Sequence, residues 1–170
     1  DFELAQAHLD ILKLATSREI ANDAMDLSLL ITDNTGLDTS TVAMQEYAAI
    51  DLLIFQNKLE EALAALNSML QKYPGHSLSD EIYYQRANIY ERMGKFGKAV
   101  EELQKIVSNP QYDILSDDAL YRMAYIYETN LNEKEKAQQL YNDLLVKHQG
   151  SVYAAEARKR FRQLRGDKLN

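Results

Sequence analysis

The sequence predicts an all-α fold in which helical hairpins stack on one another in a row. Helix-forming residues (Ala, Leu, Glu, Lys, Gln) dominate, whereas the 170 residues include only six glycines and two prolines. Apolar residues recur at steps of three and four, which is the period of an amphipathic helix. One segment, SDEIYYQRANIYE at 79–91, returns as SDDALYRMAYIYE at 116–128. Because one helical hairpin cannot bury its apolar side alone, the copies are expected to stack.

Residues 1–38 are predicted to form a first, degenerate hairpin. Its two helices carry apolar stripes at helical spacing, namely Phe2, Ala5, Leu9 and Leu12 in the first and Ile20, Ala24, Leu27 and Ile31 in the second. The first helix also carries Leu4, Ile11 and Leu14 off its stripe. A helix that is apolar on more than one side is usually sandwiched, so we expect an upstream repeat or another subunit to cover it.

Three repeats are predicted next, at 39–75, 76–113 and 114–149, followed by a closing helix and tail at 150–170. Each repeat reads as a helix of about fourteen residues, a short turn and a second helix of similar length. Asn57 and Gly94 hold equivalent turn positions, and both residue types tolerate left-handed backbone. Small residues stand where paired helices must approach closely, at Ala87, Ala99, Ala124 and Ala137.

The helix ends carry signals of their own. Ser79 and Ser116 are each followed by two acidic residues, which predicts that the two serines cap helix N-termini. Pro74 and Pro110 each follow a second helix, which a proline cannot continue. The first helices of the second and third repeats are therefore expected to start at these serines.

This pattern resembles the tetratricopeptide repeat. The positions that the family favours are occupied by Tyr83, Ala87, Tyr90, Gly94, Ala99, Leu103 and Ile106 in residues 79–111, and by Ala62, Leu66, Met69 and Pro74 in residues 42–74. Ile50 departs from the pattern, because a small residue is expected there. The resemblance implies that residues 1–170 form one right-handed α-solenoid domain with a C-terminal capping helix.

Two further likenesses concern the source of the chain. Residues 40–170 are similar to the C-terminal part of longer members of this family from Bacteroidetes-type bacteria, and residues 150–167 resemble the closing helix of bacterial cell-envelope members. A periplasmic or cell-envelope location is implied by this likeness alone. Because the chain begins with Asp1 and not with Met, we expect it to be part of a longer precursor.

Charge and hydropathy narrow the classes of partner. The formal net charge is −7, with three basic and twelve acidic residues in 1–70 but six basic and two acidic in 151–170. A nucleic-acid binder usually shows a dominant basic face, so no nucleic-acid partner is expected. The basic ending is predicted to be a solvated terminal face, or alternatively to meet an anionic partner. No apolar run approaches the roughly 20 residues that span a bilayer.

The chain offers no residue pattern typical of catalysis or of metal binding. There is no cysteine, and His8, His76 and His148 have no second ligand at metal-binding spacing. Phosphate-binding loops and hydrolase motifs are missing too. Acidic pairs such as Glu101–Glu102 are adjacent on a helix, so their carboxylates diverge. We therefore expect no enzyme activity, no metal and no cofactor.

A binding surface is implied by the resemblance, because the first helix of each pair lines the concave face in this family. The candidates are Tyr47, Tyr84 and Tyr121, which recur at intervals of 37 residues, together with Asp51, Asn88, Glu91, Tyr125, Glu128 and Arg158. Tyrosine provides large contact area at low entropic cost. The alternative is that these tyrosines pack between repeats with only their hydroxyls at the surface.

Two functions follow as hypotheses. In the first, the chain is a non-catalytic scaffold that binds a peptide or protein segment on its concave face. In the second, it is the C-terminal cap of a longer solenoid, whose N-terminal helices serve intramolecular stacking or self-association.

Overall fold

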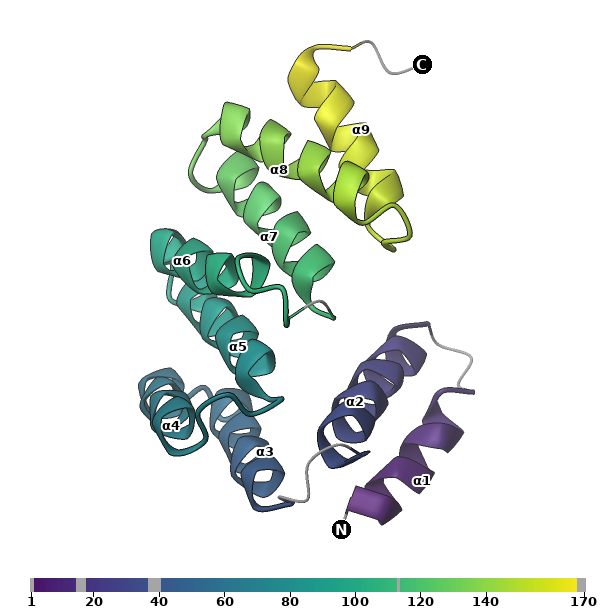
Figure 1. Cartoon of the computed structure of the whole chain (residues 1–170), viewed down its shortest axis with the longest axis vertical. Helices are drawn as coiled ribbons and strands as arrows, with labels where there is room; N and C mark the ends of the chain where they lie inside the picture. The colour runs from purple at the N-terminus through teal and green to yellow at the C-terminus, as the bar shows by residue number, and fades with distance from the viewer. Residues whose placement is uncertain (1, 15–17, 37–40, 113, 168–170) are drawn as a thin grey trace. The chain divides into compact units, whose positions relative to one another are not determined.

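The computed structural model describes residues 2–14, 18–36, 41–112 and 114–167, and all regular elements in these ranges are α-helices (Figure 1). The chain divides into two compact units, Asp1–Leu78 (unit 1) and Ser79–Asn170 (unit 2), which are described separately. The all-α prediction is confirmed.

Unit 1 contains two helical hairpins. Helix α1 (Phe2–Leu12) packs on α2 (Arg18–Gly36), and α3 (Thr41–Phe55) packs on α4 (Leu59–Lys72). The first hairpin buries Leu9, Ala24 and Ile31, as predicted. The predicted stripe was wrong at Leu27, which is 43% exposed. Ser28 is buried in its place and accepts a hydrogen bond from Gln6, because positions 24, 28 and 31 share one side of a helix.

Leu12 of the first hairpin is exposed, so the predicted stripe was wrong at that position too. The side chain of Ile20 lies outside the described residues. Leu4, Ile11 and Leu14 are exposed too. That another repeat or subunit covers these three residues stays a prediction.

The second hairpin of unit 1 accommodates the residue that departs from the family pattern. Ile50 is buried, together with Ala43, Met44 and Tyr47 of the same helix and with Ala62, Leu66 and Met69 of α4. A large side chain at this position is therefore part of the core and does not keep α3 from packing on α4.

Unit 2 is a row of helices in which each packs on the next (Figure 1). The helices are α5 (Ser79–Arg92), α6 (Phe96–Val107), α7 (Ser116–Thr129), α8 (Lys134–Lys147) and α9 (Ala154–Arg165). Two core clusters follow each other along the row, one around Leu103 and Ile106 and one around Tyr141 and Leu144. The four alanines expected at close helix contacts are fully buried. Burial thus comes from neighbouring hairpins, and unit 2 is an α-solenoid.

The predicted caps were wrong in one respect. Helix α5 begins at Ser79 and α7 begins at Ser116, but the residue that precedes α7 in the N-cap position is Leu115, and it forms no side-chain capping bond. The hydroxyl of Ser116 instead lies 3.5 Å from Nε2 of His148. The serines therefore mark where these helices start, although Ser116 does not cap one.

The hairpin turns of unit 2 require left-handed backbone at one residue each, Gly94 (φ 69°) and Asn132 (φ 55°), and Asn57 (φ 61°) does the same in unit 1. We expect Gly94→Ala to destabilise unit 2 by about 1 kcal/mol, because an L-residue is strained there. No atom lies within 4 Å of an added Cβ, so the whole cost comes from the backbone. Urea unfolding monitored by circular dichroism measures the change.

Gly97→Ala is the matched control for this substitution. Gly97 lies inside α6, and an added Cβ there also meets no atom within 4 Å. Alanine is the better helix former by about 1 kcal/mol, so this variant should be more stable than the parent. If both substitutions moved stability in the same direction, the left-handed turn would not explain why Asn or Gly stands at this point in the three hairpins.

Candidate functional site

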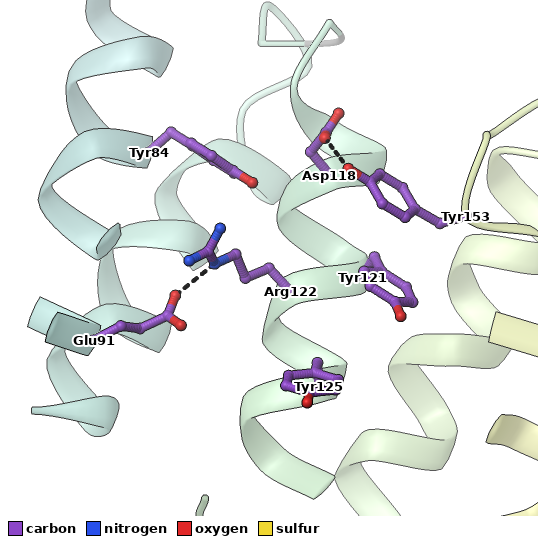
Figure 2. Close-up of a pocket in the computed structure, with 7 residues that line it drawn as sticks. All are labelled: Tyr84, Glu91, Asp118, Tyr121, Arg122, Tyr125 and Tyr153. Atoms are coloured by element: carbon purple, nitrogen blue, oxygen red, sulfur yellow. Dashed lines mark hydrogen bonds and ion pairs between the residues drawn. The ribbon is translucent and has the colours of Figure 1, made fainter. Parts of the chain in front are cut away.

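A pocket of about 370 Å³ lies in unit 2 where α5, α7 and the residue before α9 come together (Figure 2). Its lining residues are Tyr84 and Glu91 from α5, Asp118, Tyr121, Arg122 and Tyr125 from α7, and Tyr153, which is the N-cap residue of α9. The side chains come to one place because residues three or four apart share a helix face. The pocket is therefore formed by two successive repeats and the start of the closing helix.

Tyrosine rings form one wall of the pocket. The rings of Tyr121 and Tyr153 stack with centroids 4.5 Å apart and an angle of 12° between their planes. Tyr125, one helical turn further along α7, stacks on Tyr121 with ring centroids 6.5 Å apart. The Tyr153 hydroxyl donates a 2.8 Å hydrogen bond to Oδ1 of Asp118, which ties the start of α9 to α7. Burial, followed by this hydrogen bond, raises the pKa of Tyr153, so the hydroxyl stays protonated and continues to donate.

Arg122 spans the opposite side of the pocket. Its Nε donates a 2.6 Å hydrogen bond to Oε1 of Glu91, and its guanidinium carbon lies 5.7 Å from the centroid of the Tyr84 ring. Figure 2 shows this ion pair reaching from α7 to α5. Burial alone lowers the pKa of Arg122, but the bond with Glu91 and the neighbouring charges outweigh it and raise the pKa overall. The guanidinium therefore stays charged and holds two repeats together.

A second arginine borders the pocket from α9. The guanidinium carbon of Arg160 lies 4.7 Å from the centroid of the Tyr125 ring. Its Nη1 donates to Oε2 of Glu128 at 3.1 Å, and the same oxygen accepts a 2.7 Å bond from the hydroxyl of Tyr141. Glu128 thus links α7, α8 and α9 and is engaged within the protein.

The pocket contains four of the residues predicted as a binding surface: Tyr84, Glu91, Tyr121 and Tyr125. Asn88, which lies between Tyr84 and Glu91 in sequence, is half-buried outside the lining and donates a hydrogen bond to Gln85. Arg158 is exposed on α9, and Arg160 supplies the cation near the tyrosines. Whether any of these residues contacts a partner stays a prediction.

Tyr47 and Asp51 belong to unit 1 and are not lining residues of this pocket. The Tyr47 side chain is only 2% exposed, so it is part of the core of unit 1. Asp51 is half-buried, and burial raises the pKa of its carboxyl to about 6. Positions that are equivalent in the repeat pattern thus have different environments in the two units.

Three lining residues were not among those predicted from the sequence, namely Asp118, Arg122 and Tyr153. A signal for the first two was present, because Asp118, Arg122 and Tyr125 share one face of α7 by their spacing. Tyr153 has no such signal, because it precedes α9 and the equivalent N-cap position before α7 is occupied by Leu115.

The raised pKa of Asp51 makes stability depend on pH. The folded state holds this proton more tightly than the unfolded chain, so stability falls as pH rises from about 4 to about 6 and stays lower above that range. Asp51→Asn removes the cost of a buried charge, and we expect the variant to gain about 1–3 kcal/mol at pH 7 and little at pH 4. Urea unfolding at both pH values measures this.

The control is Asp26→Asn on the exposed surface of α2. It should change stability by less than about 0.5 kcal/mol at either pH. An equal gain from both substitutions would mean that overall negative charge, and not burial of Asp51, sets the pH dependence.

In the described part of the chain, no three His, Asp or Glu side chains are grouped so that they could hold a metal ion. Nor does any helix there combine the length and the apolar composition that a membrane crossing needs.

Comparisons with known proteins agree with the repeat architecture. The tetratricopeptide repeat family matches residues 80–110 and, separately, residues 118–151. Among solved structures, the chain is similar to a tetratricopeptide repeat protein from Parabacteroides merdae, with a TM-score of 0.58 and 20% sequence identity. The similarity covers 97% of this chain and 59% of the other, so the chain spans little more than half of that protein. No curated protein matches the sequence.

The two matched segments cover the hairpins α5–α6 and α7–α8, whose packing was described above. Repeats of this kind generally mediate interactions between proteins, and the family is typically non-catalytic. The hairpins, turns and stacked cores of unit 2 agree with the two matches, which identify residues 80–110 and 118–151 as tetratricopeptide repeats.

Proposed function

We propose that the chain is a non-catalytic scaffold and that unit 2 binds an extended segment of a partner protein across the pocket. The observation that carries the proposal is the convergence of four tyrosines, Tyr84, Tyr121, Tyr125 and Tyr153, on one pocket. Tyrosine is enriched among the residues that dominate binding energy at protein interfaces. The volume of about 370 Å³ fits one or two side chains of a partner segment, with the rest of that segment lying across the surface.

The pocket is also pre-ordered, which favours binding. The bonds from Arg122 to Glu91 and from Tyr153 to Asp118 fix the side chains before any ligand arrives. Most of the conformational entropy lost on binding is then that of the partner segment. Little binding free energy is spent on ordering the side chains of the pocket.

A peptide display library selected against the whole chain tests this function. We expect enriched peptides to bind with a measurable Kd in fluorescence anisotropy, and we expect Tyr125→Ala to weaken their binding about tenfold. Tyr125 is suited to the test because its ring is 40% exposed, so its loss should leave the fold intact. Tyr73→Ala, which removes a tyrosine of unit 1, is the control. Peptides that bind both variants as tightly as the parent would place the binding surface elsewhere.

One observation favours the second candidate function, a structural cap that self-associates through its N-terminal helices. Leu4, Ile11 and Leu14 expose apolar surface on and just after α1. Light scattering over a range of concentrations tests it. A chain that stays monomeric up to several hundred micromolar would count against self-association through this surface.

A further inference from the structure

We propose that the pocket of unit 2 selects a partner segment by one basic side chain, arginine in preference to lysine. This inference rests on the proposed function and specifies the chemistry of its ligand. It is carried by the charges that line the pocket and by the way tyrosine rings there already receive guanidinium groups.

The charges around the pocket are negative in sum. The lining itself has two carboxylates, Glu91 and Asp118, against one guanidinium, Arg122. The second arginine near the rings, Arg160, is bonded to both Glu128 and Glu156. The six groups together therefore have four negative and two positive charges. An acidic ligand would meet net repulsion here, whereas a basic ligand would be attracted.

Arg122 is poorly placed to receive an acidic ligand. Its Nε is already bonded to Glu91 at 2.6 Å, and its guanidinium lies along the Tyr84 ring. An incoming carboxylate would have to share the guanidinium with Glu91, whose negative charge would repel it. Asp118 accepts a 2.8 Å hydrogen bond from the hydroxyl of Tyr153. A carboxylate offers about four acceptor positions, so Asp118 can also accept from a ligand.

The tyrosine rings suit a planar cation. Within this chain, Arg122 lies 5.7 Å from the Tyr84 ring centroid and Arg160 lies 4.7 Å from that of Tyr125. Both distances are within the range of cation–π attraction. The rings of Tyr121 and Tyr153 line the pocket next to the Tyr125 ring. A ligand guanidinium can stack its flat face on such rings and donate to Asp118, whereas the ammonium group of lysine has no flat face to stack.

The test uses the whole chain and fluorescent nonapeptide pools with randomised flanks and a fixed central residue. The central residue is arginine, lysine, citrulline, methionine or glutamate. Citrulline keeps the shape of arginine without its charge. We expect the arginine pool to bind about tenfold more tightly than the citrulline pool, with lysine between them. This preference should shrink in 0.5 M NaCl, because salt screens charge attraction.

Asp118→Asn should remove the preference for arginine over citrulline and keep residual binding, since asparagine can still accept the bond from Tyr153. Asp143→Asn removes one negative charge from α8, outside the pocket lining, and should keep the preference. Thermal melts of both variants establish that they fold.

Three results would overturn the proposal in different ways. Binding of the methionine or glutamate pool as tightly as the arginine pool would refute the basic ligand and leave a peptide-binding function in place. A preference for arginine that survives Asp118→Asn would refute the assigned pocket. Failure of the parent chain to bind any pool would refute the proposed function itself and the inference with it.

Discussion

Replacing Glu102 with alanine should destabilise unit 2 by about 3–5 kcal/mol, because it leaves a buried arginine without its counter-charge. Glu102 is only 5% exposed, and its Oε1 accepts a 2.9 Å hydrogen bond from Nη2 of Arg86, which is nearly as buried. Nε of Arg86 has no hydrogen-bond partner among the described residues, so the bond to Glu102 is the main compensation for burying this cation. Urea unfolding followed by circular dichroism measures the loss.

Glu101→Ala is the control for this prediction. Glu101 is adjacent to Glu102 on α6 but exposed, so its removal should cost less than about 0.5 kcal/mol. Replacing Arg86 and Glu102 together by leucine should recover much of the lost stability, because no charge is then left buried. If Glu102→Ala were as mild as Glu101→Ala, the ion pair would be hydrated in solution and the burial argument would be wrong.

Tyr141→Ala should cost a similar amount, about 3–5 kcal/mol, because it opens a cavity in the second core cluster. The Tyr141 side chain is fully buried and packs with Leu120, Leu144 and Ala157. Tyr141→Leu keeps most of the apolar volume, and leucine occupies the equivalent position 103 in the preceding repeat. It loses the hydroxyl bond to Glu128, so we expect a smaller cost of about 1–2 kcal/mol.

The same unfolding measurement checks both variants, and Asn142→Ala on the exposed neighbouring position is the control. Equal losses for alanine and leucine at 141 would mean that the hydroxyl bond, and not the packed ring, dominates. That result would also change the view of the site, since Glu128 holds Arg160 beside the tyrosines.

The hairpins and their turns could be predicted because their signals are local. Helical spacing, a left-handed residue such as Gly94 and a proline after the second helix all act within a few residues of the chain. The errors at Leu27 and Ser116 are shifts of one position. Such shifts depend on which side of a helix meets its neighbour, and local pattern does not determine that.

The candidate site was predictable only in part. Equivalent positions in different repeats have the same surroundings only when the residues packed around them are similar. Tyr84 and Tyr121 line the pocket, but Tyr47 at the same position is buried in unit 1. Arg158 was predicted because it continues the 37-residue spacing of the tyrosines, whereas Arg160 is the arginine that lies over the Tyr125 ring. Side chains that reach between elements, such as Tyr153 to Asp118, become evident only once those elements are packed.

Val107, Tyr127 and Leu140 pack against both core clusters of unit 2, so neither cluster is complete without the other. Unfolding of one hairpin would expose the apolar core of the next, so the two hairpins are expected to unfold cooperatively. Amide hydrogens in α6, α7 and α8 should therefore exchange with solvent at a common rate, set by a single concerted opening. The pocket, whose lining comes from both hairpins, would be lost in that same event, and a bound segment would slow exchange across all three helices at once.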